Sequence, residues 1–145
     1  MMTYGTKSDE RKRLKGEVFT PPGVVFYMIM NVNKYLPDMK KMFFDPCVGE
    51  GQFPCAELVL KMFYSVDKLN EKNALIILSS IFGMDIQGDN LDQCRANMLS
   101  TFCDAYKYFT GKEISEPTLN KAILIIAHNF QVGDSLELMK ILKAG

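Results

Sequence analysis

The chain has 145 residues, the usual size of one domain, and 48% of them are hydrophobic, which suffices for a packed core. Its 17 basic and 17 acidic residues give a formal net charge of zero, which argues against an autonomous nucleic-acid binder because such proteins normally carry a basic excess. No apolar run approaches the roughly 20 residues of a membrane span, and the polar N-terminus shows no secretory signal, so we expect a soluble cytoplasmic protein.

The first residues of the chain differ in composition from the rest. Residues 1–15 are polar and charged, and we expect a loose arm or a short helix there, outside a domain that spans residues 16–145. Thr20 can cap a helix, and Pro21 with the proline after it suits a first helical turn. The pattern therefore predicts a helix over about 22–35.

The middle of the chain alternates between short apolar runs and helical patterns. We predict a buried strand over 42–44 that stops at Asp45, and then a helix after Gly51, where apolar residues recur at helical spacing. Residues 71–81 indicate another short helix, although their apolar run would also suit a strand. A second strand is predicted over 81–85.

The last third of the chain continues this alternation. A long helix is predicted over 89–110, capped by Asp89 or Asn90 and followed by Gly111. Residues 121–130 form a continuous apolar run of the kind buried on both faces of a sheet, and they predict a third strand before a closing loop and short helix. Strands that alternate with helices predict an α/β fold with a parallel sheet.

Each predicted strand ends in residues that suit ligand binding. The first strand leads into 45–53 (DPCVGEGQF), the second into Asp85 and Ile86, and the third into 133–135 (GDS). In open parallel sheets, ligands bind outside the carboxyl ends of the strands. Glycines allow the backbone to approach a ligand closely, and the N-terminus of the helix after Gly51 favours a negative group.

The acids at the strand ends indicate which ligand would fit. Asp85 can accept hydrogen bonds from ribose hydroxyls, and Asp134 can accept one from an exocyclic amine, so the set describes a nucleoside with an amino-acid or phosphate end. Taken singly, each feature has a plainer interpretation: the glycines as a turn, Asp85 as a strand-end cap, and Asp134 as the cap of the last helix. The sequence contains neither G-x-G-x-x-G nor a G-K-[ST] P-loop, so the phosphate alternatives fit less well.

The cysteine and histidine content gives little support for a metal site. The four cysteines, Cys47, Cys55, Cys94 and Cys103, contain no C-x-x-C pair, and His128 is the only histidine. Structural zinc sites use four such ligands in close pairs. We therefore expect no metal, and reduced, mostly buried thiols.

Four motifs follow one another along the chain: VFTPPGVV at 18–25, DPCVGEGQF at 45–53, FGMDIQGDNLDQCRANML at 82–99 and GDSL at 133–136. Their order and their residues resemble the motifs in the N-terminal, cofactor-binding half of the S-adenosylmethionine-dependent DNA adenine-N6 methyltransferases of the type I and type IIG kind. The resemblance covers nearly the whole chain. It implies a partial Rossmann-like S-adenosylmethionine methyltransferase fold, with three parallel strands and flanking helices.

The resemblance also assigns roles around the cofactor S-adenosylmethionine. Thr20 and Pro21 would close over its methionine end. Asp85 would hold the ribose hydroxyls, Ile86 would pack on the adenine, and Asp134 would bond the adenine amine. Four residues would surround the amino-acid moiety, and a fifth would support their loop: Asp45, Cys47, Gly49, Gly51 and, in support, Phe53.

The family's catalytic motif, [DNS]-P-P-[YF], follows G-D-S-L, whereas the only Pro-Pro pair here is Pro21-Pro22. We therefore name no catalytic residue, and we expect methyl transfer to adenine N6 only with a motif that another chain or segment supplies, together with the DNA contact. In the family's sheet the first strand lies between the second and the fourth, so 42–44 would form an open apolar edge that a homo- or hetero-oligomeric partner covers. The alternatives are a catalytically inactive binding, regulatory or decoy protein, and a scaffold without cofactor.

Overall fold

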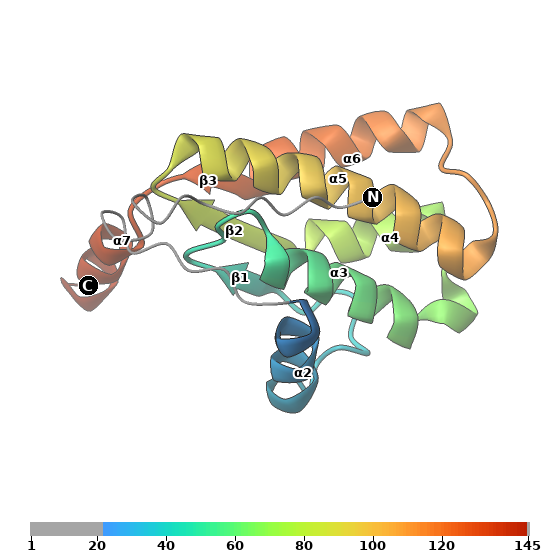
Figure 1. Ribbon diagram of the computed structural model, residues 1–145, viewed down its shortest axis with the longest axis horizontal. Helices are drawn as coiled ribbons and strands as arrows, with labels where there is room; N and C mark the ends of the chain where they lie inside the picture. Colours follow the sequence, from blue (N-terminus) through green and yellow to red (C-terminus); the bar gives the residue numbers. More distant parts are fainter. Residues whose placement is uncertain (1–21, 145) are drawn as a thin grey trace.

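The computed structural model describes residues 22–144 and shows alternating helices and strands (Figure 1). In chain order the elements are α2 (Pro22–Val32), β1 (Phe43–Asp45), α3 (Gln52–Tyr64), the 3-10 helix η1 (Val66–Lys68), α4 (Glu71–Ser79), β2 (Ile81–Asp85), α5 (Gly88–Thr110), α6 (Glu116–Asn129), β3 (Phe130–Val132) and α7 (Ser135–Ala144). The predicted arm over 1–15 lies outside the described residues.

The three strands form one open sheet in the order β1-β2-β3, and both pairs are parallel. Phe43 pairs with Ile81 at the start of the sheet, and Asp85 pairs with Val132 at its end. The predicted α/β class with a parallel sheet is therefore confirmed. Because β2 is central, β1 lies at an edge of the described sheet, as the family resemblance implied.

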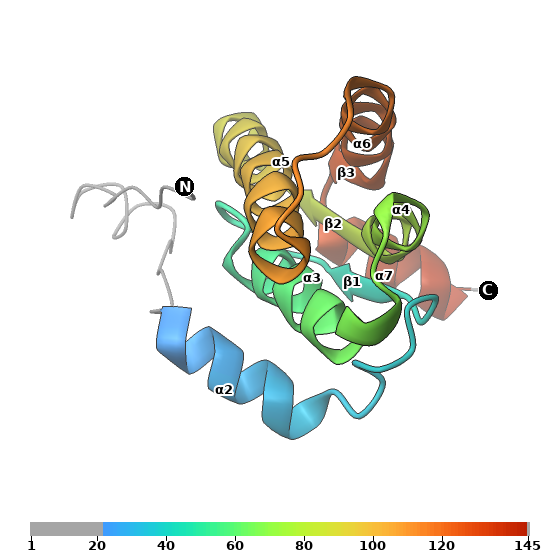
Figure 2. The ribbon, with the colours of Figure 1, turned by 90° about the vertical axis from the view of Figure 1, so that its right-hand side faces the viewer.

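Helices α3 and α5 lie side by side on one face of this sheet (Figure 2). Helices α4 and α6 run directly into β2 and β3 and pack against each other at the amino ends of the strands. Helix α2 packs against the outer side of α3 through a second, smaller apolar cluster. The main core lies between the sheet and these helices and contains Leu58, Met62, Ile77, Ile81, Met98, Phe102 and Phe130.

The prediction of a strand over 121–130 is wrong, because most of this run belongs to α6 and only Phe130 enters β3. Ala122 and Ile126 are buried at helical spacing, whereas Leu124 is 71% exposed. An apolar run longer than eight residues favours a helix over a strand, but a buried strand and a buried helix share the same composition. The ambiguous run over 71–81 is likewise helical, and Asn70 caps it by accepting a hydrogen bond from the Asn73 N–H.

Several predicted boundaries also move by a few residues. Helix α2 ends at Val32 instead of about residue 35, and β1 covers 43–45 instead of 42–44. Helix α5 begins at Gly88, so neither Asp89 nor Asn90 is its cap. Asp89 instead lies in the first turn, where a negative charge suits the helix dipole. The predicted end of this helix at Gly111, with a φ of 72°, is confirmed.

Two charged side chains of α3, Lys61 and Glu57, are buried. Lys61 donates from Nζ to Ser80 Oγ at 2.8 Å and to the Lys41 carbonyl oxygen, which joins the segments that precede β1 and β2. Glu57 is fully buried, and its Oε1 accepts a hydrogen bond from Asn33 Nδ2 at 2.6 Å. Burial raises the pKa of Glu57, against the opposing effects of the Lys61 charge and the Asn33 bond.

Replacing Glu57 by glutamine is expected to stabilise the fold progressively more as the pH rises. Because its pKa is raised in the folded state, the carboxyl contributes stability when protonated, and this contribution is lost as the pH rises through the raised pKa. Glutamine stays neutral and can still accept the Asn33 bond. Urea unfolding between about pH 4 and pH 8 should show the gap between variant and wild type widening with pH.

The matched control is Glu113→Gln, which changes an exposed carboxylate paired with Lys107. That substitution should change stability by less than about 1 kcal/mol, because exposed ion pairs contribute little. A Glu57→Gln variant that loses stability relative to wild type as the pH rises would contradict the assigned pKa direction.

Candidate functional site

The segments that follow the three strands meet at the carboxyl edge of the sheet. The Val48 N–H donates to the Met84 carbonyl oxygen at 3.0 Å, so the segment after β1 lies over the end of β2. The Gly49 N–H donates to Asp85 Oδ2 at 2.9 Å, and the Gly133 N–H donates to the Asp85 carbonyl oxygen at 3.0 Å. Asp85 therefore joins all three segments.

The loop between β1 and α3 needs glycine at two positions. Gly49 has a φ of 57° and Gly51 a φ of 95°, both in the left-handed region that other residues rarely adopt. Gly51 is the N-cap residue of α3, and a Cβ atom there would lie 2.9 Å from Cys94 Sγ. The loop therefore brings bare backbone and the N-terminus of a helix to the same place, which favours a negative ligand group.

A third glycine, Gly83, allows Val48 of this loop to pack directly against β2. A Cβ atom at Gly83 would lie 2.2 Å from Val48 Cγ1 and 3.0 Å from Phe130 Cε1. Val48 is itself 2% exposed and belongs to the main core. Sequence reasoning gave Gly83 no role, although a glycine inside an apolar strand signals close approach of another segment.

Asp85 and Asp45 both hold backbone N–H groups with their carboxylates. Asp85 is 8% exposed, and its Oδ2 and Oδ1 accept the Gly49 and Gln87 N–H groups at 2.9 and 2.7 Å. Asp45 Oδ1 accepts the Cys47 N–H at 2.9 Å. Burial is the main cause that raises the pKa of Asp45, and the nearby Asp85 charge adds to it. Since a carboxylate offers about four acceptor sites, both acids can still accept bonds from a ligand.

Asp134 directly precedes α7, and its interpretation as the cap of that helix is confirmed. Its Oδ1 accepts the Leu136 N–H at 2.9 Å, and its carbonyl oxygen accepts the Leu138 N–H at 3.1 Å. Asp is a preferred residue at this position for that reason. A bond from its carboxylate to an adenine amine stays a prediction.

The structure describes three further predicted site residues. Ile86 follows β2 and is 63% exposed at the edge of the site. Cys47 is exposed, and its Sγ lies 3.8 Å from Ser135 Oγ, which links the first and third segments. Phe53 is half-buried and packs against the α2 cluster, and its support of the loop stays a prediction. Thr20 and Pro21 lie outside the described residues.

No family model, curated protein or solved structure matches the chain. The likeness to adenine-N6 methyltransferases therefore rests on the four sequence motifs. The geometry adds that the second and fourth motifs contact Met84 and Asp85 of the third motif at one sheet edge.

The remaining chemistry within residues 22–144 is limited. No three His, Cys, Asp or Glu side chains gather there in a group that would hold a metal ion. Among the described residues no cysteine forms a disulfide: Cys55 and Cys94 are buried and Cys103 is half-buried, so only Cys47 departs from the expected burial. None of the described helices is both long and apolar enough to cross a membrane.

Proposed function

We propose that this chain is the S-adenosylmethionine-binding portion of a DNA adenine-N6 methyltransferase, with a Rossmann-like methyltransferase fold. It would transfer the methyl group to adenine N6 only with a catalytic motif from another chain or segment. One observation supports the proposal: the glycine loop, Asp85 and the Gly133–Ser135 segment, which belong to the second, third and fourth motifs, meet at one sheet edge.

The residues at this edge suit the parts of S-adenosylmethionine. The backbone at Gly49 and Gly51 would surround the amino-acid moiety, with its carboxylate toward the N-terminus of α3. Asp45 would face the ammonium group, whose positive charge favours the ionised carboxylate and offsets the cost of its burial. The site therefore offers one matching group for the carboxylate and one for the ammonium of the amino-acid moiety.

The nucleoside end would lie between the second and third strand ends. The lone pairs that Asp85 retains would accept the ribose hydroxyls, and the exposed side chain of Ile86 would cover the adenine ring. Asp134 would accept a hydrogen bond from the adenine amine, while its Oδ1 also accepts the bond that caps α7. Bound S-adenosylmethionine would supply an activated methyl group, and the described residues would hold and orient it.

One departure from the family pattern lies inside the loop, where Glu50 replaces a small residue. Glu50 is 5% exposed, and its carbonyl oxygen accepts a hydrogen bond from Asn97 Nδ2 at 2.9 Å. This bond joins the loop to α5, so Glu50 and Asn97 help to fix the position of the glycines. That asparagine belongs to the third motif, at 82–99.

S-adenosylmethionine is expected to protect Cys47 from alkylation. Cys47 is exposed within the proposed site, whereas burial raises the pKa of the Cys103 thiol and slows its reaction. At a ligand concentration of about ten times the dissociation constant, the alkylation rate of Cys47 should fall about tenfold. Mass spectrometry of peptides after timed iodoacetamide treatment would measure each cysteine separately.

Cys103 serves as the internal control, and its rate should not change with ligand. The buried Cys55 and Cys94 should stay unmodified throughout, which would show that the fold is intact. Adenosine, which lacks the methionine end, should protect Cys47 less than S-adenosylmethionine at equal concentration. Unchanged Cys47 alkylation at a saturating concentration would contradict the proposed placement of the methionine end.

A further inference from the structure

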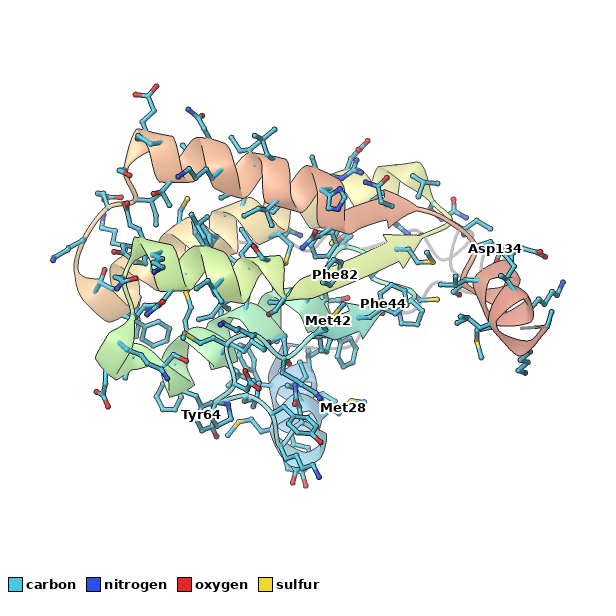
Figure 3. All side chains as sticks on the ribbon, turned by 180° about the vertical axis from the view of Figure 1, so that it is seen from behind. Met28, Met42, Phe44, Tyr64, Phe82 and Asp134 are labelled. Carbon is cyan, nitrogen blue, oxygen red and sulfur yellow. The ribbon has the colours of Figure 1, made fainter. Side chains whose placement is uncertain are left out.

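The face of the sheet opposite α3 and α5 is apolar at the β1 edge (Figure 3). Phe44 pairs with Phe82 in register, so both side chains point to this face, while their neighbours Phe43 and Ile81 belong to the main core. Phe44 is 47% exposed, and Met42, just before β1, is 70% exposed. We call Met42, Phe44 and Phe82 the open sheet face.

The backbone of β1 adds to this exposed surface. Within the described sheet, β1 pairs with β2 alone, so its outer edge is not covered by another strand. An exposed apolar edge strand normally pairs with another chain or is covered by a further element.

Helix α7 carries a second uncovered apolar surface. It extends beyond the carboxyl ends of the strands (Figure 1), and none of its residues is buried. Met139, Ile141 and Leu142 are between 51% and 71% exposed, and together with Leu138 they form one stripe at helical spacing. Glu137 and Lys140 form an ion pair on the opposite side.

These two surfaces are complementary in kind. An apolar helix stripe and an apolar sheet face each need a covering layer, and a helix on a sheet is a standard solution. Because one chain carries both surfaces, a two-fold dimer can satisfy both at once, with the same contact made twice. The formal net charge of zero means that no overall repulsion opposes such self-association.

We propose that two copies of this chain associate reciprocally, with the α7 stripe of each copy on the open sheet face of the other. At about 100 Å² for each half-exposed large side chain, the five exposed members of both surfaces would bury about 500 Å² per copy. Adjoining backbone would bring this toward the ~800 Å² per partner of a stable interface. The inference does not rest on cofactor binding.

Analytical ultracentrifugation of the chain between about 1 and 200 µM tests this interface. We expect a dimer whose dissociation constant rises at least tenfold in Phe44→Lys and also in Leu142→Lys. The control is Tyr108→Lys, since Tyr108 is 84% exposed on α5, outside both surfaces, and its substitution adds the same charge. Tyr108→Lys should leave the dissociation constant within about twofold of wild type.

Mixing the two interface variants distinguishes the reciprocal arrangement from other dimers. A heterodimer of Phe44→Lys with Leu142→Lys retains one contact in which both surfaces are unaltered, whereas each homodimer has two altered contacts. The mixture should therefore dimerise at least tenfold more tightly than either variant alone. A wild-type monomer at 200 µM, a dimer that Leu142→Lys leaves intact, or a mixture no tighter than its components would overturn the proposal. Circular dichroism of each variant would verify folding.

Discussion

Replacing Asp85 by alanine is expected to lower the affinity for S-adenosylmethionine by about 100-fold or more. The two ribose hydroxyls of the cofactor would lose their hydrogen bonds to the Asp85 carboxylate, and hydrogen bonds to a charged group contribute about 1.5–3 kcal/mol each. The substitution would also remove the acceptor of the hydrogen bonds that the Gly49 and Gln87 N–H groups donate. Isothermal titration calorimetry with S-adenosylmethionine would measure the loss.

Two further variants separate ligand contact from loop anchoring. Asp67→Ala removes an exposed acid of η1, far along the chain from the strand ends, and should bind like wild type. Asp85→Asn keeps the side-chain volume and one acceptor oxygen, so its affinity should lie between wild type and Asp85→Ala. Wild-type affinity in Asp85→Ala would remove Asp85 from the proposed site.

Replacing Gly83 by alanine is expected to destabilise the fold by about 1–3 kcal/mol, because it overpacks a tight contact. The new methyl group would lie 2.2 Å from Val48 Cγ1, so Val48 and the glycine loop would have to move away from β2. Affinity for S-adenosylmethionine should fall with it, since the loop would no longer be placed over the strand end. Urea unfolding and calorimetry would measure the two effects.

A matched glycine and a second-site change test this explanation. Gly88 has nothing within 4 Å of an added Cβ atom, so Gly88→Ala at the start of α5 should not destabilise the fold. Val48→Ala removes the clashing methyl group and should recover part of the stability lost in Gly83→Ala. Strictly additive effects of the two substitutions would show that Val48 and Gly83 do not compete for the same space.

The strand ends could be predicted from the sequence because each is marked by residues that lie close together in the chain. The apolar residues before Asp45 and Asp85 indicated strands, and the structure confirms both, although β1 is not buried as predicted, since Phe44 is 47% exposed. The glycines at 49 and 51 indicated a close approach of the backbone, and both adopt the left-handed conformation. The alternation of elements then predicted a parallel sheet, so the three ends were expected at one edge. These inferences needed only short windows of sequence.

Contacts between distant segments could not be predicted in the same way. The run over 121–130 is uniformly apolar, and only its packing against α4 and α5 shows that it is mostly helix. The proximity of Gly83 to Val48 depends on how a loop crosses a neighbouring strand. For Asp134 the sequence left two roles open, because an acid before a helix can either cap that helix or bind a ligand. The structure shows the capping hydrogen bond.

The most direct measurement of the central claim is a calorimetric titration of the unmodified chain with S-adenosylmethionine, with NAD as a control nucleotide. We expect one molecule bound per chain with a dissociation constant of about 1–100 µM, corresponding to roughly 5–8 kcal/mol, and much weaker binding of NAD. Neither heat nor a thermal shift at about 1 mM S-adenosylmethionine would contradict the proposed cofactor site.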